Sequence, residues 1–142
     1  MASIISKQYI CTDSILVVED NQAALEYFSF ILEDLKTNFK SNFTFDLVKS
    51  AEAAVELIKT KKYDKIISDY KLKDSDGLEV LKFAKQNGIQ QRILITAVSE
   101  PINLKDNVVT FAVRKPLSPR RIGELILNDY NDGINNEIFW KI

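Results

Sequence analysis

The fold is decided by Ile15-Leu16-Val17-Val18-Glu19-Asp20 and by Ile66-Ile67-Ser68-Asp69, two mostly apolar, β-branched runs that stop abruptly at acidic residues. Short runs of this kind are typical of strands in a parallel sheet that is buried on both faces. In an open α/β sheet, ligands bind in the crevice beyond the carboxyl ends of the strands. The sequence therefore predicts an acidic site at that edge.

The three carboxylates of Glu19, Asp20 and Asp69 would repel one another if they gathered there. A cation between them would make this arrangement tolerable. Hard oxygen ligands suit Mg²⁺, which usually keeps several waters and takes few protein carboxylates. The sequence therefore predicts that this edge can hold a magnesium ion.

Helical and strand patterns alternate along the rest of the chain. Apolar spacing predicts helices near 24–35, 51–58, 78–84 and 118–126. Strands are predicted at 15–18, 43–48, 66–69, 93–96 and 108–113. Strict alternation implies right-handed crossovers and a doubly wound parallel α/β sheet. Between 98 and 107, Pro101 and the scarcity of apolar residues leave room for only a short or irregular fourth helix.

The composition favours one globular domain over 1–142, with a core at about 13–129 and a C-terminal tail at 130–142. The chain has 142 residues, 46% of them hydrophobic, which is enough to bury a sizeable core. With 19 basic and 20 acidic residues its net charge is −1, so direct binding of nucleic acid is not expected. In the tail, Ile138-Phe139-Trp140 would either pack back on the domain or contact a partner or a second copy.

Several classes of protein are excluded by what the chain lacks. It has no histidine, which removes histidine-based catalysis and histidine-ligated zinc. Its single cysteine, Cys11, has no internal disulfide partner and favours a reducing compartment. No apolar stretch has the length of a membrane span, and 1–12 lacks the core of a signal peptide. A cytoplasmic protein without a membrane partner is therefore expected.

Four stretches taken together resemble the receiver (phosphoacceptor) domain of two-component response regulators. In chain order they are Ile15-Leu16-Val17-Val18-Glu19-Asp20-Asn21, Asp69-Tyr70-Lys71-Leu72-Lys73-Asp74-Ser75-Asp76-Gly77, Ile93-Leu94-Ile95-Thr96-Ala97 and Lys115-Pro116. The resemblance covers about 13–129 and implies a flavodoxin-like five-stranded sheet in the order 2-1-3-4-5.

The resemblance also implies the role of each site residue. Asp69 would accept a phosphoryl group from a histidine kinase or a histidine phosphotransfer protein, in a signalling domain that is not a conventional enzyme. Glu19, Asp20, Asp69 and the backbone carbonyl of Lys71 would hold Mg²⁺. Thr96 would hydrogen-bond one phosphoryl oxygen and Lys115 would pair with another, next to a cis peptide bond at Pro116. Mg²⁺-dependent self-phosphorylation and self-dephosphorylation, and a downstream protein target or output domain, follow from the same resemblance.

The chain departs from the pattern at the positions that usually report phosphorylation. Receivers commonly carry an aromatic residue three positions before the lysine, where this chain has Ala112, with Phe111 on the opposite side of the strand. The segment from Thr96 to Lys115 is also shorter than usual. We therefore expect that output does not use the usual fourth-helix face. The positions of Lys71 and Val98 further predict slow self-dephosphorylation.

Two other functions remain open on the sequence. A receiver-shaped scaffold could bind partners without being phosphorylated. An aspartate-dependent phosphohydrolase of the haloacid dehalogenase type needs a second aspartate two residues past the nucleophile, where this chain has Lys71. The sequence also leaves open whether the chain acts alone, as a homodimer or as a piece of a larger regulator or hybrid kinase.

Overall fold

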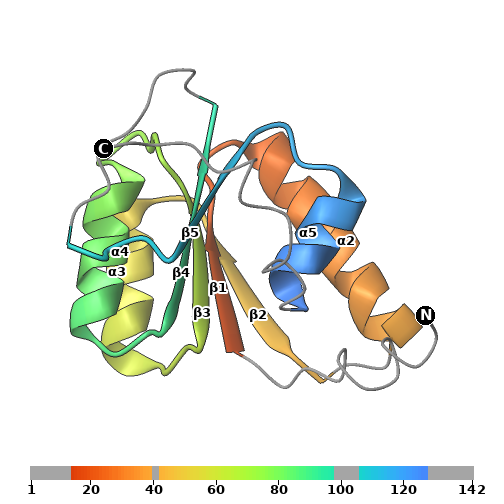
Figure 1. The fold of residues 1–142 in the computed structure, drawn as a ribbon, viewed down its shortest axis with the longest axis horizontal. Coiled ribbons are helices and arrows are strands. Elements are labelled where there is room, and N and C mark those ends of the chain that lie inside the picture. The colour runs from red at the N-terminus through yellow and green to blue at the C-terminus, as the bar shows by residue number, and fades with distance from the viewer. Residues whose placement is uncertain (1–13, 40–41, 98–105, 128–142) are drawn as a thin grey trace.

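The computed structural model describes residues 14–39, 42–97 and 106–127 (Figure 1). The elements are β1 (Ser14–Val18), α2 (Gln22–Phe39), β2 (Thr44–Val48), α3 (Ala51–Thr60), β3 (Lys65–Asp69), α4 (Gly77–Gln86), β4 (Gln91–Thr96), β5 (Phe111–Arg114) and α5 (Pro119–Ile126). Each of these strands and helices was predicted from the apolar spacing. The short helix expected at 98–107 falls largely outside the described residues, and so does the tail at 130–142.

The five strands form one parallel sheet in the order β2-β1-β3-β4-β5, as predicted. This order places β1 beside β3 in the middle of the sheet, with Val18 opposite Ser68. The carboxyl ends of these two strands therefore meet, and the residues that follow them share one edge.

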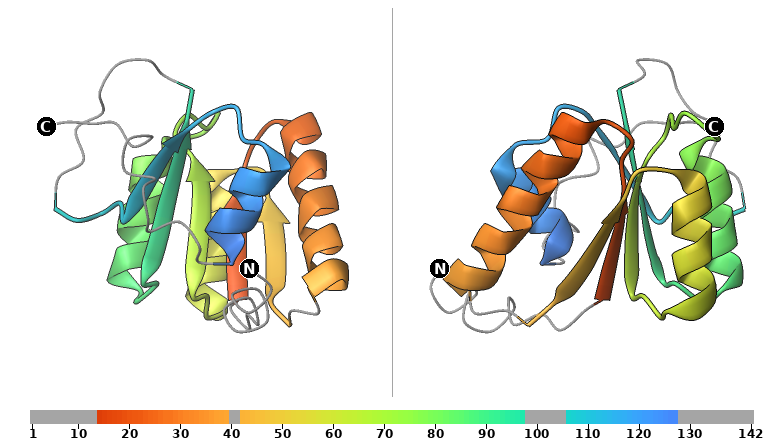
Figure 2. Two further views of the ribbon diagram at one scale, coloured as in Figure 1. Left: turned by 45° about the vertical axis from the view of Figure 1, so that its right-hand side comes forward. Right: turned by 180° about the vertical axis from the view of Figure 1, so that it is seen from behind.

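Helices cover both faces of the sheet, with α2 and α5 on one side and α3 and α4 on the other (Figures 1 and 2). Side chains of β1 alternate between the two layers: Ile15 and Val17 pack with α2 and α5, and Leu16 and Val18 pack with α3 and α4. All four are almost completely buried. A strand covered on both faces has no solvent side, which is why the sequence of β1 is apolar at every position from Ile15 to Val18.

Each helix begins at a side chain that accepts a hydrogen bond from its first turn. Ser50, Asp76 and Ser118 cap α3, α4 and α5. Asn21 rather than Asp20 caps α2, with its Oδ1 2.8 Å from the Ala24 nitrogen. These caps satisfy amide groups that have no partner within the helix. The Asp20 carboxylate is consequently available for other contacts.

A fully buried lysine connects the opposite end of the sheet to α5. Lys65 begins β3, and its Nζ donates hydrogen bonds to the carbonyls of Leu125 (2.5 Å) and Ile126 (2.9 Å). These carbonyls belong to the last turn of α5, where a helix accumulates partial negative charge. Lys65 therefore fixes the C-terminal end of α5 against the sheet.

Strand β5 begins at Phe111, three residues later than predicted. The carbonyls of Asn107 and Val108 instead accept hydrogen bonds from the buried guanidinium of Arg92, each at 2.7 Å. They are thus engaged by a side chain and do not extend the ladder with β4. Within β5, Phe111 packs on the α2/α5 side and Ala112 on the α3/α4 side, as the alternation predicted.

Candidate functional site

Three carboxylates gather at the carboxyl edge of the sheet. Glu19 and Asp20 directly follow β1, and Asp69 is the last residue of β3. Each offers an oxygen that lies within 4.8 Å of the other two. The Glu19 side chain is buried, and its Oε2 accepts a hydrogen bond from the Asn21 amide at 3.1 Å. The acidic cluster predicted from the two strand ends is therefore present.

An ammonium group faces the same cluster from β5. The Nζ of Lys115 lies 3.3 Å from Oδ1 of Asp69 and 3.2 Å from Oε1 of Glu19. Lys115 immediately follows β5 and precedes a cis peptide bond to Pro116, as expected. Thus residues separated by about a hundred positions along the chain form one charged site.

The charges shift two pKa values in this site. Burial, together with the negative charges of Glu19 and Asp20, raises the pKa of Asp69 to about 6, although Lys115 opposes the shift. Burial alone would lower the pKa of Lys115, but the carboxylates of Asp69 and Glu19 outweigh it and hold that pKa above its usual value. Three carboxylates thus face one ammonium at this site, and burial adds to the cost of ionising Asp69.

The other predicted site residues lie at the same edge. Thr96 is the last residue of β4 and is buried, and its carbonyl accepts a hydrogen bond from the Lys115 amide at 2.8 Å. Lys71 lies two residues past Asp69 in the β3–α4 loop, where it forms an isolated bridge with Asp76. The contact of the Thr96 hydroxyl with a phosphoryl oxygen and the binding of Mg²⁺ by the Lys71 carbonyl remain predictions.

The β3–α4 loop, residues 70–76, is attached to the acidic cluster and to the sheet. The Lys73 amide donates a hydrogen bond to Oδ2 of Asp20 at 2.7 Å. The Tyr70 amide donates to the carbonyl of Ile95 in β4 at 2.8 Å. A movement of the Asp20 carboxylate would therefore change a hydrogen bond made by the backbone of this loop.

The sequence places Gly77 in a turn but does not indicate how closely this residue approaches the end of β3. A Cβ atom at this position would lie 2.2 Å from the Asp69 carbonyl oxygen and 2.9 Å from Oγ of Ser68. Only glycine allows the start of α4 to approach the backbone of Asp69 so closely. The available signal was a poor helix former at the first position of a helix.

The donor set fits a magnesium ion. All three side chains offer carboxylate oxygens, which Mg²⁺ prefers. Burial, and after it the charge of Glu19, raises the pKa of Asp69, so the ionised form of this carboxyl is disfavoured without a cation. A divalent cation would relieve the repulsion between these carboxylates.

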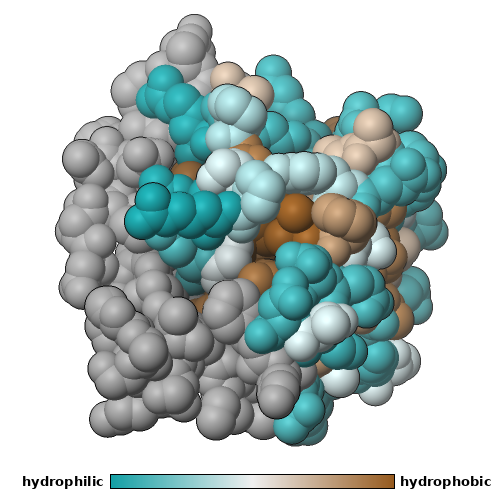
Figure 3. Space-filling view, turned by 90° about the vertical axis from the view of Figure 1, so that its right-hand side faces the viewer, coloured by the Kyte–Doolittle hydropathy of each residue, from teal (hydrophilic) through white to brown (hydrophobic). Residues whose placement is uncertain are grey.

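An apolar hollow of about 210 Å³ lies beside Lys115, between α2 and the start of α5. Its lining includes Tyr27, Phe28, Leu117 and Ile122. The face formed by α2 and α5 shows apolar groups at its centre among hydrophilic ones (Figure 3). On α2, Tyr27 is 40% exposed and Phe30 is 70% exposed. The site thus has an accessible apolar surface next to it.

None of the described helices combines the length and the apolar character needed to cross a membrane.

Comparison with known proteins gives consistent matches. The family model of the response regulator receiver domain matches residues 15–126. A stretch of 67 residues, 47% of the chain, is 36% identical to hybrid signal transduction histidine kinase B of Dictyostelium discoideum, of which it covers only 3%.

Solved structures agree with these sequence matches. A CheY-like receiver domain from Methylobacillus flagellatus is similar with a TM-score of 0.69 and 26% identity, over 84% of this chain and 98% of that one. A CheY-like receiver domain protein from Methanospirillum hungatei has the same fold, with a TM-score of 0.66 and 21% identity over 89% and 97% of the two chains.

Proposed function

The chain belongs to the response regulator receiver domain family, and from this premise we propose that Asp69 accepts a phosphoryl group and that phosphorylation then changes the contacts the protein makes with other proteins. The observation that carries the proposal is the position of the Lys115 ammonium, 3.3 Å from Oδ1 of Asp69, opposite the carboxylates of Glu19 and Asp20. An isolated acidic residue that merely ended a strand would require neither an ammonium nor further carboxylates around it.

The phosphoryl donor is proposed to be a phosphohistidine on a histidine kinase or a phosphotransfer protein. A bond forms between a carboxylate oxygen of Asp69 and phosphorus as the phosphorus–nitrogen bond breaks, and the electron pair remains on the imidazole nitrogen. With a pKa of about 6, Asp69 is mostly ionised at pH 7 and can act as the nucleophile. Lys115 neutralises one phosphoryl oxygen, and the Thr96 hydroxyl donates a hydrogen bond to another.

The proposed cofactor is Mg²⁺, held by the carboxylates of Glu19, Asp20 and Asp69 and by the backbone carbonyl of Lys71. When bound, it supplies positive charge that stabilises the phosphoryl oxygens during transfer. The same groups support self-phosphorylation from a small phosphodonor and slow hydrolysis of the phosphorylated aspartate.

The donor protein is proposed to dock over α2, beside the site. Tyr27 and Phe30 expose large aromatic surfaces there, and the hollow next to Lys115 is apolar. Exposed aromatic side chains around a recessed apolar area are typical of protein contacts. A donor bound in this way would bring its histidine to the edge that carries Asp69.

The partners that receive the signal are proposed to be a downstream protein, a second copy of the chain or an output domain on the same polypeptide. A cytoplasmic location is part of the proposal. The similarity to a protein named as a hybrid signal transduction histidine kinase supports a place in a phosphorelay.

The decisive experiment is mass spectrometry of the purified protein after incubation with acetyl phosphate and Mg²⁺. We expect the mass to increase by one phosphoryl group, located on Asp69 by peptide mapping. The gain should disappear in Asp69→Asn and when Mg²⁺ is chelated. An unmodified protein under these conditions would favour the non-phosphorylated scaffold instead.

A further inference from the structure

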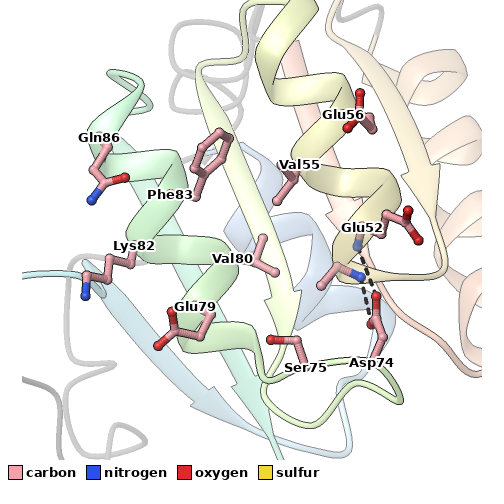
Figure 4. A pocket seen from close by; sticks show the side chains of 11 residues that line it. Glu52, Val55, Glu56, Asp74, Ser75, Glu79, Val80, Lys82, Phe83 and Gln86 are labelled. Atoms are coloured by element: carbon pink, nitrogen blue, oxygen red, sulfur yellow. Dashed lines mark hydrogen bonds between the residues drawn. The ribbon is translucent and has the colours of Figure 1, made fainter.

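A groove of about 560 Å³ lies between α3 and α4, on the face of the sheet opposite α2 and α5. Its apolar lining comes from Val55 of α3 and from Val80 and Phe83 of α4 (Figure 4). Val55 and Phe83 are only partly buried, so apolar surface is open to a partner. Asp74 and Ser75, from the β3–α4 loop, close one end of the groove.

The rim of the groove is acidic. Glu52, Glu56, Asp74 and Glu79 contribute carboxylates, against a single ammonium from Lys82 in the lining. Glu56 has an exposed neighbour of opposite charge, Lys59, at 3.5 Å. The carboxylates of Glu52 and Glu79 make no hydrogen bond or ion pair within the described part of the chain and point outward beside the groove (Figure 4).

We propose that this groove docks a protein segment in which lysine or arginine side chains flank apolar ones. The apolar lining offers burial, and the rim offers charge complementarity to a basic segment. The same negative rim repels phosphate groups, which disfavours a nucleic acid or an anionic lipid surface as the occupant. The inference rests on the proposed function in one respect: it makes the groove the output contact of the receiver.

The β3–α4 loop connects the groove to the phosphoacceptor site. The two carboxylate oxygens of Asp74 accept hydrogen bonds from the Ala51 and Glu52 amides, each at 3.0 Å, so the loop caps the start of α3. One residue earlier, the Lys73 amide donates to Asp20 in the acidic cluster. A rearrangement of the cluster is therefore transmitted through adjacent residues to a wall of the groove. The affinity of the groove should depend on the phosphorylation state of Asp69, and the dependence is reciprocal.

The test uses two synthetic amphipathic helices and the isotope-labelled full chain. In both peptides leucines occupy positions i, i+3, i+4 and i+7 of an alanine background; lysines flank them in one and glutamates in the other. Amide chemical shifts are followed during each titration, with and without acetyl phosphate and Mg²⁺. We expect the lysine peptide to shift amides of α3 and α4 and the glutamate peptide to leave them unchanged.

A charge exchange identifies the rim as the determinant. The double variant Glu52→Lys with Glu79→Lys should bind the lysine peptide about tenfold more weakly and should now bind the glutamate peptide. The double variant Glu26→Lys with Glu33→Lys, on α2, makes the same change of charge on the other face and should bind as the unaltered protein does. Glu52 and Glu79 lie in the first turns of their helices, where lysine is unfavourable. The paired Gln variants therefore provide a second test that keeps the side-chain shape, and they should also weaken binding of the lysine peptide.

The outcomes separate this inference from the proposed function. The docking proposal is overturned if the lysine peptide shifts no amides of α3 and α4, or if the exchanged variant keeps its preference for lysine. Equal affinity with and without a phosphoryl group on Asp69 would also overturn it as an output contact. A protein that gains no mass at Asp69 but binds the lysine peptide in the groove would contradict the phosphoacceptor function alone.

Discussion

Replacing Asp69 by asparagine should stabilise the metal-free protein at neutral pH. Asp69 is ionised there, yet it is mostly buried and faces the carboxylates of Glu19 and Asp20. Asparagine keeps the shape of the side chain and removes one of the crowded negative charges. Lys115 retains its contact with Glu19, so the variant leaves no buried cation without a partner.

The magnitude follows from the pKa of Asp69, which rises from its ordinary value of 3.8 to about 6 on folding. One pKa unit corresponds to about 1.4 kcal/mol, so ionised Asp69 costs the folded protein at most about 3 kcal/mol. Solvent at the edge of the site screens part of this, and we expect Asp69→Asn to raise the free energy of unfolding by about 1.5 to 2.5 kcal/mol at pH 7.

The pH dependence has a definite sign. A carboxyl group whose pKa is raised by folding favours the folded state below its unfolded pKa, and this contribution is lost as pH rises through the folded pKa. The unaltered protein should therefore lose stability relative to Asp69→Asn as pH rises from 3.8 towards about 6. At pH 4 the difference between the two should be below about 1 kcal/mol.

Urea unfolding in a chelator at constant ionic strength, from pH 4 to pH 7.5, measures this difference. Groups common to both proteins cancel in the comparison, and Glu33→Gln on the exposed side of α2 controls for the loss of one charge. Equal stabilities at pH 7, or a gap that does not change with pH, would refute the argument. Adding Mg²⁺ at ten times its dissociation constant should stabilise the unaltered protein by about 1.4 kcal/mol and the variant by less.

Three further substitutions test residues that hold the elements around the site in place or protect the phosphorylated aspartate. Lys65→Met should lower the free energy of unfolding by about 2–4 kcal/mol, because it leaves two carbonyls of α5 without a donor; urea unfolding against the exposed Lys62→Met control measures it, and an equal effect of both would contradict it. Gly77→Ala should slow phosphorylation by acetyl phosphate, because the new Cβ would displace the Asp69 backbone; an unchanged rate of mass gain would count against that close approach. Lys71→Ala should shorten the lifetime of the phosphorylated protein, followed by mass spectrometry after removal of the phosphodonor. A lifetime of seconds in both proteins would rule out protection by Lys71.

The sheet and the acidic cluster could be predicted from the sequence because both depend on local patterns. From Ile15 to Val18, β1 is buried on both faces and is therefore apolar at each position. The resemblance to receiver domains implied the strand order that brings β1 beside β3, so the acids that follow or end these strands, Glu19, Asp20 and Asp69, meet at one edge.

The buried cations could not be predicted in this way. Lys65 at the start of a strand resembles a solvent-exposed end, and only the packed fold shows that the carbonyls of α5 surround its ammonium. Arg92 likewise donates hydrogen bonds to the carbonyls of Asn107 and Val108, about fifteen residues away. Because of these contacts β5 begins later than the sequence predicted. Asp74 caps a helix that precedes it by more than twenty positions. Such contacts depend on tertiary proximity, which hydrophobic periodicity does not record.

The attachment of Lys65 to the last turn of α5 constrains how that helix can respond to events near Lys115. Sliding α5 along its own axis would pull the carbonyls of Leu125 and Ile126 away from a fully buried ammonium, which has a large energetic cost. Its beginning, at Ser118, follows the connection from β5, where an exposed Tyr27 hydroxyl donates a hydrogen bond of 3.4 Å to the Leu117 carbonyl. We therefore expect a disturbance at the site to rotate this helix about its C-terminal end, which Lys65 holds, with the largest displacement at Pro119.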